Sequence, residues 1–327
     1  MRVAVTGSIA VDYLMTFPGR FSELIVLEQL DRLSLSFLVD DLQVRRGGVA
    51  ANICYGMAQL GLRPILVGAA GHDFADYRAW LERHGIDTAS VRVSELRHTA
   101  RFHCTTDLDN RQIASFYTGA MAEARFIELA PVAQRVGALD LVVVSPNDPD
   151  AMLRHTEEAR QLGVRFVADP SQQLARMSGE QVRQLVDGAA YLISNDYERA
   201  LLESKTGWTA EEVLRRVGVR VTTYGAHGCA VERRGTAPIE VPAFPEEHVV
   251  DPTGVGDGFR AGFLAGLAWD LSLERSAQVG SLVATLVLES VGTQEYRVEP
   301  ADFLTRFAAT YGQAAADDFT RHVQATV

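Results

Sequence analysis

Three glycines, Gly254, Gly256 and Gly258, surround a single aspartate, Asp257, directly before a segment with helical spacing. The first N–H groups of a helix have no acceptor within it, and the helix dipole is positive there, so an anion binds well. Glycines let an oxygen of that anion come close to the backbone. A carboxylate beside the same place can accept a proton from a hydroxyl group. An anion site next to a base suits phosphoryl transfer, whereas the structural alternative is a glycine-rich cap that only packs tightly.

The segment after Asp257 predicts a buried helix. One face is made of large apolar residues and another of small residues only, so other elements can approach it closely on both sides. The large residues are Phe259, Phe263, Leu264 and Leu267, and the small ones are Gly258, Ala261, Gly262, Ala265 and Gly266. The turn is not a Walker A loop, since no G-K-[ST] follows. It is not G-x-G-x-x-G either, since Phe259 replaces the third glycine.

Composition limits the classes of function. The chain has 327 residues, 47% hydrophobic and 22% charged, which is typical of a globular protein with one large core or a core plus a smaller unit. A net charge of −11 argues against nucleic acid as the main partner. No uninterrupted apolar stretch is long enough to predict a membrane span, and Asp12 interrupts what would be the apolar part of a secretory signal. Three scattered cysteines favour reduced thiols, so we expect a cytoplasmic protein.

Short β-branched runs alternate with segments of helical spacing, which predicts an open, mostly parallel sheet covered by helices. Such sheets bind ligands at the carboxyl ends of their strands. The predicted strands are Val3–Gly7, Ile65–Ala69, Leu141–Ser145, Arg165–Asp169, Tyr191–Asn195 and Val219–Thr223. The predicted helices between them include Asn52–Leu60, Phe74–His84, Asp150–Gln161 and Tyr197–Ser204.

Two stretches interrupt this alternation. Asp31–Gln43 alternates with period two and no helix follows it, while Ala100–Tyr117 forms two alternating arms around a D-L-D-N turn. They predict a small antiparallel β unit, either a decorated edge or a lid over the site. We favour the lid, and expect residues 13–42 and 100–118 to form it and residues 1–12, 43–99 and 119–327 to form the α/β core.

Four motifs together resemble the ribokinase-like family of carbohydrate and nucleoside kinases. They are Gly47-Gly48-Val49-Ala50-Ala51-Asn52, Asn195-Asp196-Tyr197-Glu198, Thr223-Tyr224-Gly225-Ala226-His227-Gly228 and Asp251-Pro252-Thr253-Gly254-Val255-Gly256-Asp257. Their order and separations are those of the family, so the resemblance covers essentially the whole chain. Stretches such as LSLSFLVDDL, HTARFHCTTDLDNRQIASFYTGAMAEA and ADPSQQLARMSG are similar to the bacterial adenosine kinases of this family.

The resemblance implies a three-layer, doubly wound α/β fold with a β lid and a homodimer formed through the lids. It also implies transfer of the γ-phosphate of ATP to the 5′-hydroxyl of adenosine. In that reaction Asp257 is the base, and the N–H groups of Gly254, Val255 and Gly256 form the anion hole. Asn195 and Glu198 organise Mg²⁺ by the triphosphate, largely through water. The residues that line the ATP site are Asn195, Thr223, Gly225 and Gly228.

The same resemblance implies a nucleoside pocket. Asp12, Gly48 and Asn52 hold the ribose hydroxyls, since a carboxylate and an amide suit a diol. The rest of the pocket is formed by Ser8, Ser36, Phe102, Phe116, Gln172, Gln173 and Arg176. Gly258 departs from the family, which usually has alanine there.

Several alternatives stay open at this point. Asn52 could simply cap a helix, Glu198 could be a solvated charge, and Gln172-Gln173 could be a plain polar loop. A ribokinase- or fructokinase-type sugar kinase is the next candidate, and a non-catalytic nucleoside-binding regulator is a candidate from another class. Whether a monovalent cation such as K⁺ is required near Asp251 and Thr253 is also open.

Overall fold

The computed structural model describes residues 1–24 and 36–324. Within them, the central sheet has nine strands in the order β13-β12-β11-β10-β9-β8-β1-β4-β5, parallel from β5 to β11 and antiparallel at the β12–β13 edge. Its strands are β1 (Val3–Thr6), β4 (Ile65–Ala70), β5 (Val91–Val93), β8 (Leu141–Val144), β9 (Arg165–Ala168), β10 (Tyr191–Asn195), β11 (Val219–Thr223), β12 (Cys229–Glu232) and β13 (Ile239–Val241).

The six strands predicted from sequence are all present, each end within one residue of its predicted position. Alternating side chains face opposite sides of a strand, and the two hydrophobic cores follow that rule. Val3 and Val5 of β1 belong to the core on one face, and Ala4 belongs to the core on the other. The predicted three-layer α/β fold is therefore confirmed.

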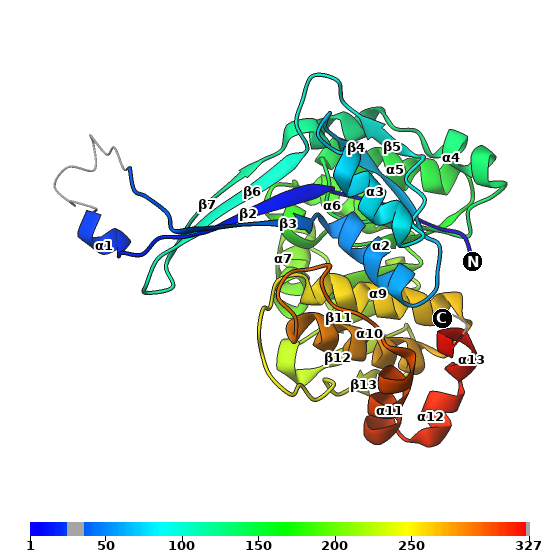
Figure 1. Cartoon of the computed structure of the whole chain (residues 1–327). Helices are drawn as coiled ribbons and strands as arrows, with labels where there is room; N and C mark the ends of the chain where they lie inside the picture. Colours follow the sequence, from blue (N-terminus) through cyan, green and yellow to red (C-terminus); the bar gives the residue numbers. More distant parts are fainter. Residues whose placement is uncertain (25–35, 325–327) are drawn as a thin grey trace.

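Helices cover both faces of the sheet (Figure 1). The α-helices are α1 (Phe21–Leu24), α2 (Val49–Gln59), α3 (Ala75–Arg83), α4 (Leu129–Val136), α5 (Pro149–Gln161), α6 (Gly179–Val186), α7 (Asp196–Thr206), α8 (Ala210–Arg216), α9 (Val255–Ala268), α10 (Leu273–Leu288), α11 (Pro300–Tyr311), α12 (Gln313–Asp317) and α13 (Thr320–Gln324). Short 3₁₀ turns are η2 (Gly119–Phe126), η3 (Ser171–Ala175) and η4 (Gly225–His227). Among the helices in the described part of the chain, none combines the length and apolar character that a bilayer span requires.

The small-residue face of α9 packs against α10. A Cβ on Gly262 would lie 2.7 Å from the Cα of Gly280, and one on Gly266 would lie 2.6 Å from the Cα of Ser276. At Gly258, where the family usually has alanine, a Cβ would lie 2.7 Å from Cγ2 of Val287. A methyl group of Val287 on α10 therefore takes up the space that the Cβ of an alanine at position 258 would need.

A second sheet of four strands forms the lid, in the order β3-β2-β6-β7. Figure 1 shows it as an arm that extends from the body, with α1 at its far end. Its strands are β2 (Ala10–Thr16), β3 (Asp41–Gly47), β6 (Ala100–Thr106) and β7 (Gln112–Tyr117). The outer pairs are antiparallel, but the central pair β2–β6 is parallel.

The lid differs from the prediction in its N-terminal half. Residues 31–35 lie outside the described residues, and residues 36–40 are not a strand. The strand begins at Asp41 and runs to Gly47, so Gln43–Gly47, expected in the core, belongs to the lid sheet. The physical reason is its pairing with β2, where Gly47 lies opposite Ala10 and Asp41 opposite Thr16.

Candidate active site

A cavity of about 470 Å³ lies between the lid and the carboxyl ends of the central strands. Most of the residues predicted to bind the acceptor substrate line it. These are Ser8, Asp12, Gly48, Asn52, Phe102, Phe116, Gln172, Gln173 and Arg176, and they are joined by Gly254 of the predicted anion hole and by the predicted base Asp257. The cavity therefore joins the lid, the start of α2, the loop after β9 and the start of α9 in one place.

Asp257 is held by a network that sequence reasoning did not predict. Nδ2 of Asn52 donates to Oδ2 of Asp257 at 2.8 Å, and Oδ1 of Asn52 accepts from Thr293 Oγ1 and Gln294 Nε2, both at 2.9 Å. This fixes which side of the Asn52 amide faces the carboxylate. Thr293 also donates to the backbone oxygen of Arg46. Asn52 is thus neither a simple helix cap nor free to serve the ribose alone.

The glycines of the turn are required by protein neighbours. Gly254 has a φ of 78°, a left-handed conformation that favours glycine, and a Cβ there would lie 2.7 Å from Cγ2 of Thr293. A Cβ on Gly256 would lie 2.8 Å from Nη1 of Arg260. Among the N–H groups predicted to bind an anion, that of Val255 lies 3.4 Å from the oxygen of Pro252, a long and weak contact.

Burial shapes the acidity of the two carboxylates. Asp257 is partly buried where it lines the cavity, and its poor hydration raises its pKa to about 7. Arg260 and the hydrogen bond from Asn52 lower that pKa, while Asp169 and Asp12 raise it. Burial, followed by the charge of Asp251, raises the pKa of Asp12 to about 6. A carboxyl with a pKa near 7 suits a general base at neutral pH.

Three residues lie in one row across the lid sheet. Phe102 of β6 is the register partner of Asp12 on β2 and of Phe116 on β7. Side chains at directly opposite positions project from the same face, with neighbouring strands about 4.8 Å apart. The prediction that the hairpin sets Phe102 across from Phe116 is confirmed. The row places two phenyl rings beside a carboxylate on the wall of one cavity.

The side-chain amide of Gln173, which lines the cavity, is buried. Gln173 donates from Nε2 to the backbone oxygen of Asn147 at 2.7 Å, which fixes the orientation of the amide. Its carbonyl oxygen Oε1 is buried and has no hydrogen-bond partner among the described residues. Ser8 has a structural contact too, because its Oγ accepts from the N–H of Val49 at the start of α2.

The residues predicted to bind ATP do not line this cavity. Asn195 and Thr223 end β10 and β11, and Gly225 and Gly228 flank the turn after β11. Asn195 and Glu198 form a reciprocal capping box at the start of α7. Glu198 N–H donates to Asn195 Oδ1 at 2.7 Å, and Asn195 N–H donates to Glu198 Oε2 at 2.9 Å. Glu198 is therefore a helix-capping carboxylate rather than a solvated charge.

Among the residues predicted to bind the acceptor, Ser36 does not line the cavity, nor do Val255 and Gly256 of the predicted anion hole, and several cavity residues were missed. Ser36 itself is exposed. The residues that sequence reasoning did not assign to the pocket are Ala10, Val49, Met121, Pro146, Thr253 and Thr293. Thr253 lies within a quoted motif and Pro146 follows a predicted strand, so their positions gave a signal. Thr293 gave none, because it follows the long helix α10 and reaches the site only through tertiary packing.

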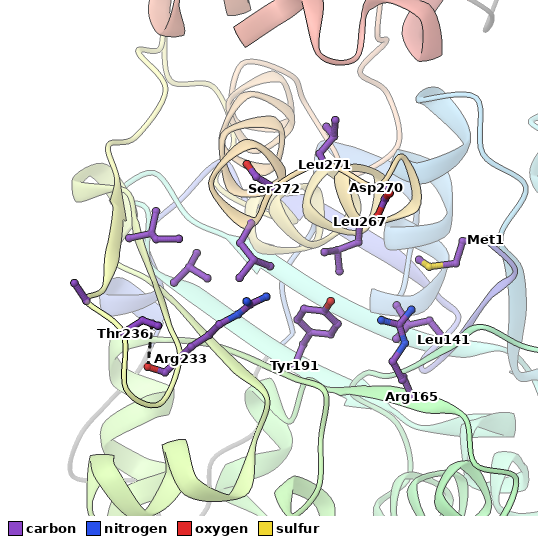
Figure 2. A pocket seen from close by; sticks show the side chains of 14 residues that line it. Met1, Leu141, Arg165, Tyr191, Arg233, Thr236, Leu267, Asp270, Leu271 and Ser272 are labelled. Carbon is purple, nitrogen blue, oxygen red and sulfur yellow. Dashed lines mark hydrogen bonds between the residues drawn. The ribbon is translucent and has the colours of Figure 1, made fainter.

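A different cavity, of about 620 Å³, lies at the opposite edge of the sheet (Figure 2). It is lined by the first residues of β8, β9 and β10, namely Leu141, Arg165 and Tyr191, and Figure 2 shows the Tyr191 ring between Arg165 and Arg233. None of the predicted site residues lines it. The candidate active site is therefore at the carboxyl edge, as expected for a parallel sheet.

Comparisons with known proteins agree with this geometry. The chain is 33% identical over 306 residues to the nucleoside kinase of Methanothermobacter thermautotrophicus, covering 92% of this chain and 97% of that protein. The structure of Burkholderia thailandensis nucleoside kinase in complex with inosine superposes with a TM-score of 0.84 at 34% identity, covering 95% of this chain and 99% of that one. That of the Methanocaldococcus jannaschii nucleoside kinase, described as an archaeal member of the ribokinase family, superposes with a TM-score of 0.82 at 25% identity, covering 94% and 99%. Residues 7–300 match the family described as pfkB family carbohydrate kinase, and the chain belongs to that family.

Proposed function

We propose that the protein is an adenosine kinase, which transfers the γ-phosphate of ATP to the 5′-hydroxyl of adenosine and releases AMP and ADP. The observation that carries the proposal is the single cavity in which Asp257 lies with the row Asp12, Phe102 and Phe116. A base, a carboxylate for a diol and two rings for a purine match the three parts of a nucleoside. A kinase for bare sugars has no use for the two rings.

In this reaction Asp257 accepts the proton of the 5′-hydroxyl as that oxygen attacks the γ-phosphorus. The new O–P bond forms while the bond to the oxygen shared with the β-phosphate breaks, so the leaving group is ADP. The N–H groups at the start of α9 stabilise the charge on the transferred group. The half-ionised state of Asp257 near pH 7 leaves it able both to take and to release a proton.

The side-chain amide of Gln173, which lines the cavity, offers a hydrogen-bond partner to a purine base. One hydrogen of its Nε2 is donated to the backbone oxygen of Asn147, the second stays available as a donor, and Oε1 has no partner among the described residues. Oε1 suits the 6-amino group of adenine, and the second hydrogen of Nε2 suits O6 of inosine or guanosine, so the acceptor panel decides between these nucleosides. Inosine is the main alternative substrate to test against adenosine, because the structure of the Burkholderia thailandensis nucleoside kinase is a complex with inosine.

Purified protein is expected to convert adenosine and ATP to AMP and ADP, and EDTA is expected to stop the reaction. The measurement is a panel of adenosine, inosine, guanosine, ribose and fructose with MgATP, scored by kcat/KM for each acceptor. Preference for inosine or guanosine would leave a nucleoside kinase and remove the adenosine assignment. Preference for ribose or fructose would favour the sugar-kinase alternative, and binding without turnover would favour the regulator.

Mg²⁺ fits Asn195 and Glu198 through water rather than directly. Both oxygens of Glu198 already accept hydrogen bonds, Oε1 from Ser171 and Oε2 from Asn195, and Mg²⁺ usually keeps several of its waters. Among the described residues, no three His, Cys, Asp or Glu side chains gather as a direct metal cluster. Bound with ATP, Mg²⁺ would neutralise charge on the phosphates. The carboxylate of Asp251 accepts hydrogen bonds from the backbone N–H groups of Thr253 and Gly292. The rate measured with and without K⁺ tests whether this cation is required.

Glu198→Gln should raise the Mg²⁺ concentration needed for half-maximal rate, because a carboxylate beside the metal's water shell becomes neutral. Glutamine preserves a capping box, so α7 should stay folded. Glu212→Gln is a matched control, since Glu212 forms the same capping box with Thr209 at the start of α8. The measurement is the rate as a function of Mg²⁺ at fixed ATP. If both variants need the same Mg²⁺ concentration for half-maximal rate, Glu198 has no role toward the metal and only caps the helix.

We also propose a homodimer formed through the lids. Exposed apolar side chains on the lid strands include Leu42, Val44 and Ile113. Apolar patches of this kind mark association sites more often than free surface. Light scattering gives the molecular mass that decides between monomer and dimer.

A further inference from the structure

A buried ion pair lies beneath the glycine turn and has no part in the mechanism so far. Nη2 of Arg260, on the second turn of α9, donates to Oδ1 of Asp169, which follows β9, at 2.6 Å. The two side chains are 8% and 0% exposed. Oδ2 of Asp169 and Nε of Arg260 are buried and have no hydrogen-bond partner among the described residues. A buried, incompletely satisfied ion pair is weak support for stability, so a functional reason is needed.

The guanidinium of Arg260 occupies the space that a side chain at position 256 would need. A Cβ there would lie 2.8 Å from Nη1 of Arg260, and residues 256 and 260 are one helical turn apart on one face. The arginine therefore lies against the turn that carries Asp257, in space that a side chain at position 256 would have to share. The positive charge lies against the turn that carries Asp257, and Arg260 itself does not line the cavity.

Groups from several elements act on Asp257. Arg260 on α9 stabilises its charged form, as does the hydrogen bond from Asn52 on α2. Asp169 after β9 and Asp12 on β2 act against the charged form, and the buried phenol of Tyr296 is also close enough to be affected by Asp257. Arg260 is the cation in this set. Glu198 acts on both members of the ion pair, so the pair also lies near the side where ATP is proposed to bind.

We propose that Arg260 is a positioning residue of the phosphoryl-transfer site: anchored by Asp169 beneath the glycine turn, its guanidinium favours the ionised form of the Asp257 carboxylate without touching the substrate. The inference rests on the proposed function. Asp169 has the opposite effect, because it holds Arg260 in an ion pair of its own and weakens the positive field at Asp257. A direct ion pair between Arg260 and Asp257 would instead tie up the oxygen that must accept the proton.

The test uses one variant at each end of the ion pair, Arg260→Met and Asp169→Asn. For each, kcat/KM for adenosine is measured as a function of pH, and the pH at which the acid limb falls is compared with that of the unaltered protein. In the unaltered protein the limb should fall near pH 7, the value to which burial raises the pKa of Asp257. Loss of the cation raises that pKa, so Arg260→Met should move the limb to higher pH by about one unit. Loss of the anion lowers the pKa, so Asp169→Asn should move the limb to lower pH. Arg260→Lys, which keeps the charge, should restore most of the profile.

Opposite shifts are the result that a merely structural ion pair would not give. Arg220→Met is the matched control, since Arg220 is a buried arginine paired with Glu232 and Glu203 and does not act on Asp257. It should lower the melting temperature and leave the acid limb in place. Shifts in the same direction for both variants of the pair, or lower stability with no shift, would overturn the proposal. If Arg260→Met does not fold, the other two variants still test the proposal. Asp169→Asn should move the acid limb to lower pH, and Arg260→Lys should leave it nearly unchanged.

A second readout separates this inference from the proposed function. NMR titration of protein labelled with ¹³C at the aspartate carboxyl carbons gives the pKa of Asp257 directly, with its resonance assigned by its loss in Asp257→Asn. Opposite shifts of that resonance in a protein that phosphorylates no nucleoside would support the coupling of Arg260 to Asp257 and overturn the proposed function. No shift of the resonance in an active adenosine kinase would overturn the role of Arg260 alone.

Discussion

Asp257→Asn is expected to lower kcat for adenosine by about 10²- to 10⁴-fold, the usual contribution of a positioned general base. Asparagine keeps the volume of the side chain and an oxygen that can accept the hydrogen bond from Asn52, so the cavity should keep its shape. It cannot take the proton of the 5′-hydroxyl. The adenosine KM should change little, because ribose binding is assigned mainly to Asp12, Gly48 and Asn52.

Stability separates lost chemistry from lost folding in this variant. Burial raises the pKa of Asp257 above its value in the unfolded chain, so ionising this carboxyl at neutral pH opposes folding. That destabilisation is absent at a pH below the unfolded pKa and grows as the pH rises toward 7. Removing the charge should therefore leave the melting temperature at pH 7 unchanged or higher. Asp76→Asn, a change of an exposed aspartate in the first turn of α3, is the control and should leave kcat unchanged. Near-normal turnover in folded Asp257→Asn protein would exclude the mechanism.

Phe102→Ala and Phe116→Ala are each expected to raise the adenosine KM by roughly ten-fold to a hundred-fold. Stacking of a base on an aromatic ring contributes about 1–3 kcal/mol by alanine substitution, which corresponds to that range. Both side chains line the cavity, and the two residues are register partners on β6 and β7. Turnover of any poor sugar substrate should hardly change, since a sugar has no base to stack.

The competing explanation makes these rings part of the lid's packing or of the dimer contact. Tyr117→Ala tests it, because Tyr117 is the next residue on β7, projects to the opposite face and is 45% exposed, as is Phe116. The measurements are adenosine KM, melting temperature and molecular mass for the three variants. Equal KM effects at Phe116 and Tyr117, or unchanged KM with a smaller molecular mass, would assign the rings to structure.

Much of the fold could be predicted from the sequence because its signals are local. Strands such as Tyr191–Asn195 and Val219–Thr223 are short β-branched runs, and this pattern depends only on neighbouring residues. The pairing of Phe102 with Phe116 follows from the symmetry of one turn. The start of α9 could also be predicted, since Gly254 and Asp257 lie within four residues. The edge strands β5 and β13 were missed because three residues are too few to show a period, and β12 beside β13 was missed as well.

Tertiary structure alone decided how these pieces form a site. The parallel pairing of β2 with β6, which brings Asp12 beside Phe102, joins segments about ninety residues apart with no turn to set the register. The bond from Asn52 to Asp257 spans 205 positions, and the ion pair from Arg260 to Asp169 spans 91. A sequence shows that Asn52 and Arg260 are polar residues on helices, but not which carboxylate each will meet. The sequence thus determined the glycine turn with Asp257 and the pair of rings, while packing across the sheet decided the partners that affect the charge and orientation of Asp257.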